Sequence, residues 1–339
     1  MSVAKIAVVI PGYNHAAYIG PAIASVLAQD WPNLELSVLD DGSSDDTAGA
    51  AERAVAGQQR VAARIEHQAN QGSARTLNRL IERCDADYIA ILNSDDLHAP
   101  GRLRALAERA AGHELFFGIT GMDFLQSGAT EDFGLFEDWY RSKFHYAAQL
   151  PTCGFALLGA NITVTSSNFF FSRELFDLVG GFDPALPLTQ DWAFAVGALR
   201  WTEPTLLPGR LMSYRVHPDN TWRRLQDVRR AQSVRVLEGF AAWAGEPCLN
   251  SLAPTPGNWP SFFPFFVRVC GTLFSDDPVG RFLPPGLVAL GQTGPGLPRD
   301  RGAVARLLAA TRHPLDETSD TSAALTAAVE HWEAVRRTA

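Results

Sequence analysis

The stretch YIAILNSDDL, Tyr88 to Leu97, joins an apolar segment directly to two adjacent carboxylates. Residues 88–92 are apolar at both parities and partly β-branched, which predicts a short strand buried on both faces. Asp95 and Asp96 follow its carboxyl end, where like charges repel each other unless a positive group lies close by. The pair is therefore either part of a solvated loop or the binding site of a cation.

The composition indicates a globular protein without a nucleic-acid partner. The chain has 339 residues, 46% of them hydrophobic, and a formal net charge of −8. This length and apolar content suffice for one large or two modest domains. A net negative charge argues against nucleic acid as a partner, because contacts to phosphates require a basic face.

The N-terminus and the cysteines indicate a cytoplasmic protein. The sequence enters strand material at once, without a charged and then apolar signal segment. The four cysteines are scattered, with no spacing typical of a zinc or redox site, so we expect reduced thiols. The longest aromatic run, SFFPFFVRVCGTLF, is too short to span a bilayer. We expect a cytoplasmic chain, with peripheral contact at the inner face of the membrane as its closest approach to lipid.

The first hundred residues alternate between strand and helix patterns. The segments KIAVVI, LELSVL, ARIEHQ and YIAIL predict strands, and helices are predicted for about residues 17–29, from about residue 47, and up to about residue 83. Such alternation predicts an α/β fold with a doubly wound, mostly parallel sheet and helices on both faces. The loops PGYN, DDGSSDD and NSDD follow three of these strands, so they converge on the sheet edge where ligands bind.

Two of these loops carry groups that suit a nucleobase. Tyr13 lies in the first strand-to-helix turn, and an exposed ring there could stack on a base with ~1–3 kcal/mol. Asp41 leaves a buried strand at the same edge and could accept a base N–H. The simpler interpretation of Tyr13 and Asn14 is an ordinary turn. For Asp45 and Asp46 we adopt the simpler interpretation, a solvated turn before a helix.

The carboxylate pair in NSDD suits a divalent metal. Mg²⁺ is typically held by one or two protein carboxylates together with substrate phosphates. Neighbouring residues of an extended chain point in opposite directions, so one carboxylate could face a metal while the other reaches a sugar hydroxyl. The sequence has no G-x-G-x-x-G after its first strand and no phosphate-binding lysine loop, so its chemistry rests on these carboxylates and the turn aromatics.

Six motifs together carry a resemblance to a known family. In order, they are IPGYN, VLDDGSSDDT, NQGSARTLN, YIAILNSDD, VGGFDP with QDW, and YRVHPDNTW. Their order and spacing resemble those of family 2 glycosyltransferases with the GT-A fold, over about residues 4–222. The resemblance implies that the chain binds a nucleoside-diphosphate sugar, and it assigns roles to individual residues.

The implied donor site lies on the first four strands. By resemblance, Pro11 and Tyr13 border the base, Asp41 binds it, and Asp95 contacts the ribose. Asn14 belongs to the same turn and is added to this site. Arg75 could neutralise phosphate or lie on an exposed helix face, and the sequence leaves these two alternatives open.

The implied metal and catalytic residues come from three later motifs. By resemblance, Asp96 binds a divalent metal, Mn²⁺ or Mg²⁺, that bridges the diphosphate, and His217 closes over the metal. Asp191 matches the base that activates the acceptor, although an Asp before a helix is also a common N-cap. Two positions depart from the family pattern, with Gln190 where a glutamate is frequent and Thr76 where an asparagine is frequent.

These assignments predict a metal-dependent, inverting glycosyltransferase. It would move a sugar from a nucleoside-diphosphate sugar, with UDP as the favoured carrier, to the hydroxyl of a saccharide or lipid-linked saccharide in polysaccharide or glycoconjugate assembly. Asp191 would take the acceptor proton during one in-line displacement. The alternatives are a sugar nucleotidyltransferase, which would need a glycine-rich basic loop after the first strand, and a degenerate binding subunit, which would have lost the Asp pair or Asp191.

The change in sequence character predicts two regions. Residues 1–222 would form the GT-A domain, with a nucleotide-binding half at 1–112 and an acceptor-binding half at 113–222. Residues 223–339 would be mainly helical, with an amphipathic helix in LQDVRRAQSVRVLEGFAAWA and two closing helices in GAVARLLAATR and SAALTAAVEHWEAVRR. The run SFFPFFVRV, if exposed, would serve peripheral membrane contact or a homo-oligomer, because exposed apolar patches mark interfaces. Packing of this run on the catalytic domain is the alternative.

Overall fold

The structure is a computed structural model that describes residues 3–128, 133–147, 150–224, 226–260, 262–267 and 285–290. The chain divides into two compact units. The first unit comprises Met1–Glu137, Thr163–Ala198 and Pro204–Arg229, and the second comprises Asp138–Ile162, Leu199–Glu203 and Arg230–Ala339. The predicted boundary near residue 222 lies close to the end of the first unit, and two short segments of the predicted acceptor half belong to the second. The functional limits of the domains stay a prediction.

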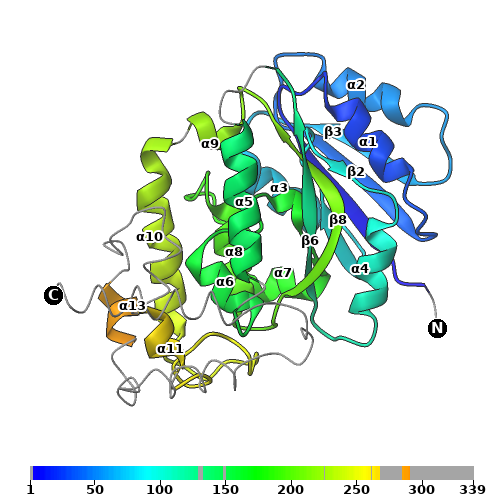
Figure 1. Cartoon of the computed structure of the whole chain (residues 1–339). Coiled ribbons are helices and arrows are strands. Elements are labelled where there is room, and N and C mark those ends of the chain that lie inside the picture. The colour runs from blue at the N-terminus through cyan, green and yellow to red at the C-terminus, as the bar shows by residue number, and fades with distance from the viewer. Residues whose placement is uncertain are drawn as a thin grey trace. The chain divides into compact units, whose positions relative to one another are not determined.

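The first unit is built on one eight-stranded sheet with the order β3-β2-β1-β4-β7-β6-β8-β5 (Figure 1). Strands β1 to β4 are mutually parallel, β6 is parallel to β8, and β7 and β5 run antiparallel to their neighbours. This arrangement confirms the predicted α/β fold with a mostly parallel sheet. The strand bounds are β1 Ile6–Gly12, β2 Leu34–Asp40, β3 Ala62–His67, β4 Tyr88–Ile91, β5 Leu97–His98, β6 Phe117–Gln126, β7 Phe170–Ser172 and β8 Thr205–Val216.

Helices cover both faces of this sheet (Figure 1). On one face α1, α2 and α4 pack on alternate residues of β1, where Ile6, Val8 and Ile10 are fully buried in one apolar cluster. On the other face lie α3, α7 and α8. The bounds are α1 Ile19–Leu27, α2 Thr47–Val55, α3 Ser73–Glu82, α4 Arg102–Ala110, α7 Arg173–Val179 and α8 Gln190–Ala198. The three helices predicted in the first hundred residues are confirmed.

An aromatic cluster fixes α8 against the sheet. The rings of Phe182 and Phe194 stack with centroids 4.6 Å apart, and Phe194 also contacts Phe117, Phe169 and Phe171 of the sheet region. Aromatic pairs contribute ~0.5–1.5 kcal/mol each beyond the area that they bury. Because Phe194 lies one turn after the start of α8, this packing also fixes the first turn of the helix, which carries Asp191.

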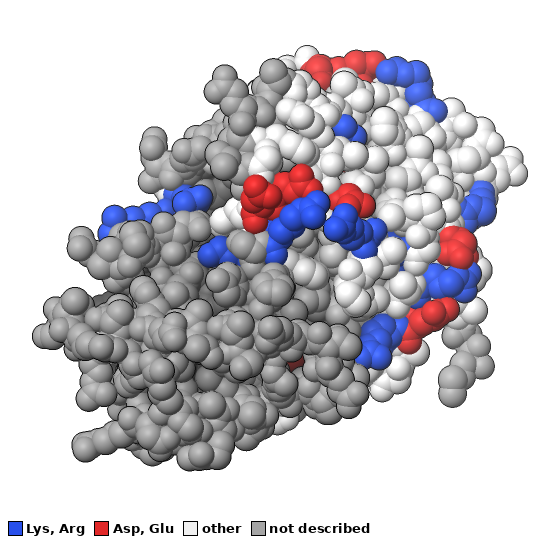
Figure 2. Space-filling model, viewed as in Figure 1, with Lys and Arg blue, Asp and Glu red and all other residues white. Residues whose placement is uncertain are grey.

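Four further elements belong wholly or partly to the first unit. The turn η1 Ser166–Asn168 precedes β7, α9 Thr221–Arg224 follows β8, and α5 Phe133–Ala147 and α10 Gln226–Trp243 each extend from the first unit into the second. On the face drawn in Figure 2, acidic and basic side chains alternate over the described residues instead of forming a continuous basic surface.

The second unit contains α6 Cys153–Gly159, α11 Phe262–Phe265 and α13 Pro285–Leu290. Phe155 contacts the rings of Trp259, Phe262 and Phe266 at centroid distances of 4.8–5.4 Å. The described apolar residues of the SFFPFFVRV run are buried, namely Phe262, Phe263, Pro264, Phe266 and Val267. The run therefore gives no support to an exposed interface, and contact with a membrane or a second copy stays a prediction.

None of the helices in the described ranges is long and apolar enough to cross a membrane. The amphipathic helix predicted after Trp222 is present as α10, although its described part begins at Gln226. The two helices predicted in GAVARLLAATR and SAALTAAVEHWEAVRR fall outside the described residues.

Candidate functional site

The loops after β1 and β2 are joined to each other at one edge of the sheet. The Asp41 amide donates to the Gly12 carbonyl over 2.7 Å, so the two strand ends lie side by side. Asn14 has a positive φ of 52°, and its Oδ1 accepts from the Ser44 amide at 2.8 Å. Tyr13 stands between these contacts with its residue surface 42% exposed. The structure thus presents an exposed aromatic ring on a rigid turn.

Asp41 is nearly buried and links the β2 end to the start of α3. Its carboxylate accepts from the amides of Gln71 and Gly72 and from the side-chain amide of Gln68, each at 2.8 Å. A carboxylate at a helix N-terminus is also stabilised by the helix dipole. Gly42 allows this packing, since it has φ +76° and a Cβ there would stand 2.8 Å from the Asn70 amide nitrogen. Asp41 therefore has a fixed position beside the Tyr13 turn.

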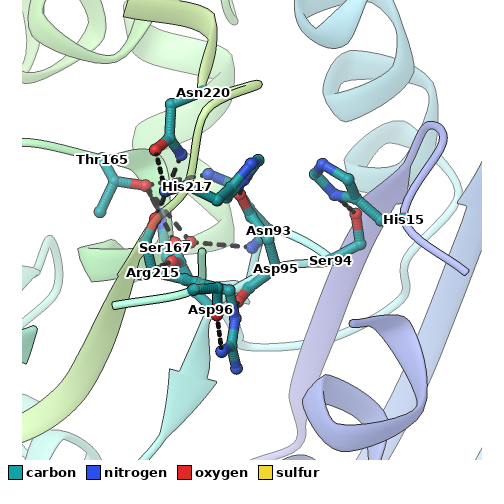
Figure 3. Close-up of polar contacts among 11 residues, drawn as sticks. His15, Asn93, Ser94, Asp95, Asp96, Thr165, Ser167, Arg215, His217 and Asn220 are labelled. Atoms are coloured by element: carbon teal, nitrogen blue, oxygen red, sulfur yellow. Dashed lines mark hydrogen bonds and ion pairs between the residues drawn. The ribbon is translucent and has the colours of Figure 1, made fainter. Parts of the chain in front are cut away.

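Asp95 and His217 form a buried pair across the sheet. His217 Nε2 lies 3.0 Å from Asp95 Oδ2, and the Arg215 Nε donates to the Asp95 carbonyl over 2.7 Å (Figure 3). Burial opposes ionisation of Asp95, but the hydrogen bond from His217 and the charges of His15 and His217 outweigh it, so the pKa of Asp95 lies below its usual range. The carboxylate is thereby kept in its charged form.

Asp96 is fully buried and is held from two sides. Its Oδ2 accepts from Ser167 Oγ at 2.5 Å, and its Oδ1 accepts from the Arg215 amide at 2.8 Å. Burial and the charge of Asp95 raise the pKa of Asp96 well above its usual range. The side chain therefore connects the loop after β4 to η1 and to β8 (Figure 3).

His15 completes a group that could hold a metal ion. Its Nδ1 lies 2.8 Å from Ser94 Oγ, and its ring centroid lies 5.5 Å from that of His217 (Figure 3). Potential ligand atoms of His15, Asp95 and His217 all lie within 4.8 Å of one another. The structure therefore places Asp95 in the candidate metal group, while Asp96, predicted as the ligand, makes the contacts given above.

The donor atoms of this group fit a divalent cation. Two neighbouring ligands of an octahedral ion with bonds of about 2.1 Å stand about 3 Å apart, which is the separation of Asp95 and His217. His217 Nδ1 is buried without a hydrogen-bond partner among the described residues, so the Nε2 side carries the polar contact of the ring. Because Mg²⁺ is bound by oxygen ligands, a group of two imidazoles and one carboxylate suits a transition metal such as Mn²⁺ better.

Asp191 lies in the first turn of α8 and is buried. The Thr189 carbonyl accepts from the Ala193 amide at 2.8 Å, so Thr189 is the N-cap residue and the interpretation of Asp191 as an N-cap is wrong. Asp191 Oδ1 accepts from the Trp192 amide at 2.7 Å instead. Its negative charge is still favourable in the first turn of a helix.

The charges of Asp191 and of the Asp pair act on the same buried phenol, that of Tyr214. Burial and the nearby charges of Asp96, Asp95 and Asp191 raise the pKa of Tyr214 well above its usual range. The two departures from the family pattern have structural partners, because Gln190 Nε2 donates to Ser73 Oγ at 2.9 Å and Thr76 Oγ1 accepts from Gln68 Nε2 at 2.9 Å.

The remaining predicted residues occupy less central positions. Pro11 lies in β1 opposite Leu39, and Arg75 lies exposed on α3. Sequence reasoning missed His15 as a member of the metal group and Arg215 as a contact of both aspartates. The available signals were the histidine in PGYNHAAY and the arginine two residues before His217.

The sheet and its loops define the GT-A class of fold. One half of the sheet is parallel and carries polar loops at its carboxyl edge, and the other half is mixed and carries further acidic and imidazole groups. The chain belongs to glycosyl transferase family 2, whose family model matches residues 7–178. This confirms the resemblance seen in the six motifs.

Individual relatives agree with this assignment. The GalNAc(5)-diNAcBac-PP-undecaprenol β-1,3-glucosyltransferase of Campylobacter jejuni is 29% identical over 115 residues, which are 34% of this chain and 37% of the relative. The mannosyltransferase PcManGT of Pyrobaculum calidifontis, in complex with GDP-Man and Mn²⁺, has a TM-score of 0.55 at 17% identity and covers 96% of this chain and 80% of its own.

A second solved structure has the same fold. Residues 1–349 of S. aureus TarS in complex with UDP give a TM-score of 0.50 at 18% identity, covering 72% of this chain and 66% of that one. At these identities the two structures establish the shared fold alone. The chain spans about a third to a half of the length of the curated relatives that it matches.

Proposed function

We propose that this family 2 glycosyltransferase moves a sugar from a nucleoside-diphosphate sugar to an acceptor hydroxyl, with a divalent metal, Mn²⁺ or Mg²⁺, and with inversion at the anomeric carbon. The observation that carries the proposal is the convergence of Tyr13, Asp41 and the Asp95–His217 pair on loops of one sheet. Stacking, hydrogen-bonding and metal-binding groups are the three kinds of contact that a nucleoside diphosphate requires.

The donor nucleotide would lie along the loops after β1, β2 and β4. Its base would stack on Tyr13 beside Pro11 and Asn14 and would donate to Asp41, whose carboxylate is already oriented by loop amides. With the base placed on Tyr13, Asp95 would lie within reach of the ribose and the diphosphate, because it follows strand β4, which pairs with β1. The exposed Arg75 on α3 is a further candidate for a phosphate contact.

The metal would be held by Asp95 and His217, with His15 as a third ligand. When bound, it would supply positive charge beside the leaving diphosphate. The backbone amide of His217 donates to Asn220 Oδ1 at 2.7 Å, and this bond fixes the backbone that carries the imidazole ring. Asp96 as a direct ligand stays a prediction from the resemblance, and its bonds to Ser167 and Arg215 would also suit a residue that orients the loop.

Asp191 would accept the proton of the acceptor hydroxyl. A general base needs an acceptor oxygen within hydrogen-bond reach of that proton once the substrates are bound. Asp191 Oδ1 accepts from the Trp192 amide, and the phenol of Tyr214 lies near enough for the charge of Asp191 to raise its pKa. The acceptor oxygen would attack from the face opposite the leaving diphosphate, so a single displacement inverts the configuration.

The relatives favour a role in the assembly of cell-surface glycans. The name of the Campylobacter jejuni relative refers to a lipid-linked glycan, which supports a saccharide or lipid-linked saccharide as acceptor. A cytoplasmic location with peripheral contact at the inner face of the membrane would suit such an acceptor. That residues 223–339 contact a membrane or a second copy stays a prediction from the sequence alone.

A donor panel tests the proposed function. The purified chain is incubated with sugar nucleotides that differ in base and sugar, with Mn²⁺ or with EDTA, and release of nucleoside diphosphate is measured. We expect slow hydrolysis of at least one donor with Mn²⁺ and loss of that signal in EDTA. If no donor is bound or turned over, the chain would instead be a degenerate family member that binds a partner protein and has no catalytic activity.

A further inference from the structure

Arg102 is a fully buried arginine in the first turn of α4. Burial of a charged group is costly unless an opposite charge lies beside it. Burial lowers the pKa of Arg102 to about 9, and no carboxylate among the described residues counteracts this effect. The first turn of a helix also disfavours a positive charge, because the helix dipole is positive there. The hydrogen bonds of the guanidinium must therefore offset two electrostatic costs.

These hydrogen bonds join α4 to β6 and to the turn η1. Nη2 of Arg102 donates to the Asn168 carbonyl at 2.9 Å and to Asn168 Oδ1 at 3.2 Å, and Nη1 donates to Thr120 Oγ1. Asn168 is the last residue of η1, and its side-chain amide donates to the Thr120 carbonyl at 2.9 Å. All three side chains are buried. Arg102 therefore fixes the end of η1 inside the first unit.

The same turn holds the acidic loop after β4. Ser167 Oγ donates to Asp96 Oδ2 at 2.5 Å and accepts from the Asn93 amide at 2.8 Å (Figure 3). Thr165, the N-cap residue of η1, accepts from the Asn93 side-chain amide at 2.9 Å. These bonds hold the loop on both sides of Asp95. The position of Asp95 is therefore set by η1.

We propose that Arg102 is a positioning residue of the candidate metal site: it holds η1, and η1 holds the loop that presents Asp95 to the metal. The proposal rests on the proposed function, since it concerns the metal that would bind the diphosphate. A metal ligand must keep its position to within about 0.5 Å. Loss of a group that supports a ligand typically weakens metal binding by about 10–100-fold. Contacts of the nucleotide with the loops after β1 and β2 should be unaffected.

Arg102→Met tests this role. It removes the guanidinium, keeps an unbranched side chain that suits a helix, and leaves no ionic partner unpaired, so we expect a folded chain. The affinity for UDP is measured by calorimetry with Mn²⁺ and with EDTA. The gain in affinity from Mn²⁺, at least about tenfold in the wild type, should fall to about threefold or less, with the affinity in EDTA unchanged. A fall of both affinities together would mark a merely structural role and overturn the proposal.

Gln29→Met is the matched control. Gln29 is buried and holds the start of the same helix, because its side chain donates to the Ala99 carbonyl at 2.9 Å and accepts from the Leu103 amide at 3.2 Å. None of its hydrogen bonds in the described structure reaches η1. We expect Gln29→Met to keep the wild-type gain from Mn²⁺. An equal loss of the gain in Gln29→Met and Arg102→Met would exclude a path through η1.

Ser167→Ala tests the last step of the path. It removes the bonds to Asp96 and Asn93, so the gain from Mn²⁺ should fall as it does in Arg102→Met. Because both changes act on one path, the double variant should lose no more of the gain than either single variant. Losses that add would show that Arg102 acts by another route, which contradicts the proposal.

Arg102→Lys keeps the test decisive where Arg102→Met does not fold. An ammonium retains the charge but lacks the fork that bonds Asn168 and Thr120 together, so the gain from Mn²⁺ should again be reduced. A wild-type gain in a folded variant of Arg102 would overturn the positioning role and leave the proposed function intact. Absence of any gain in the wild type would overturn the metal in the proposed function as well.

Discussion

Nε2 of His217 lies 3.0 Å from Oδ2 of Asp95, although 122 residues separate them in the sequence. The sheet brings them together. The two-residue strand β5 directly follows Asp96 and pairs antiparallel with β8, with Leu97 opposite Ser213. The residues before β5 therefore meet the residues at the end of β8, and the acidic loop is placed against Arg215 and His217.

This relationship predicts that nucleotide binding depends on metal through His217. In the wild type we expect UDP to bind at least about tenfold more tightly with Mn²⁺ than with EDTA, because the metal links the diphosphate to Asp95 and His217. In His217→Ala this difference should shrink to about threefold or less. Calorimetric titration of UDP in both conditions measures the effect.

The control for His217 is His113→Ala, which removes an exposed histidine outside the site. An equally large metal effect in His217→Ala would exclude this histidine as a ligand. Comparison of Asp95→Asn with Asp96→Asn then separates the two carboxylates. The geometry predicts loss of the metal effect in the first, and an equal loss in the second would support direct ligation by Asp96.

A second prediction concerns Asp191 as the general base. Asp191→Asn keeps an oxygen that can accept from the Trp192 amide, so folding and UDP affinity should be retained. The transfer rate should fall by ~10²–10⁴-fold, which is typical for removal of a general base. Initial rates of sugar transfer at saturating donor measure this. Asp183→Asn is the control, and a larger loss there than in Asp191→Asn would move the base to Asp183.

A third prediction concerns stacking on Tyr13. The exposed ring should contribute ~1–3 kcal/mol to nucleotide binding if a base lies on it. Tyr13→Ala should therefore weaken UDP binding by that amount, while Tyr13→Phe, which keeps the ring, should bind UDP nearly as the wild type does. Calorimetry measures both affinities. Similar affinities for the Ala and Phe variants would show that the base lies elsewhere.

A fourth prediction concerns Glu203 in the second unit. Its Oε1 accepts from the Gly154 amide at 2.8 Å, and burial raises its pKa from 4.5 to about 7 despite this and other hydrogen bonds. Because the folded state then holds a proton that the unfolded state has released, stability should fall as pH rises from about 4.5 to about 7 and level off above that. Since the residue is partly exposed, we expect a loss of about 1–3 kcal/mol.

Urea unfolding at pH 5 and pH 8 measures this loss. Glu203→Gln mimics the protonated form, so it should be about as stable as the wild type at pH 5 and more stable at pH 8. Glu246→Gln changes an exposed glutamate of the same unit and should leave the pH dependence as it is in the wild type. A wild-type stability that does not fall between the two pH values would contradict the raised pKa.

The sequence predicted the first half of the fold well because the information there is local. Strands such as Ile6–Gly12 and Leu34–Asp40 are apolar runs bounded by turn residues, and parallel pairing of such runs follows from the helices between them. The loops that follow them therefore had to meet at one edge. The start of α8 lies two positions earlier than an N-cap at Asp191 would place it, because Thr189, and not the aspartate, provides the N-cap carbonyl.

The sequence by itself determined the family, the parallel half-sheet and the set of residues at its carboxyl edge, since these depend on patterns within a few residues of one another. Only the tertiary structure decided how those residues divide their work. Hydrogen bonds between distant segments connect Asp96 to Ser167 and Arg215, and a ring contact brings His15 next to His217. Other hydrogen bonds hold Asp41 against the start of α3. Such contacts depend on strand order and register, which bring together side chains far apart in sequence and which no local pattern encodes.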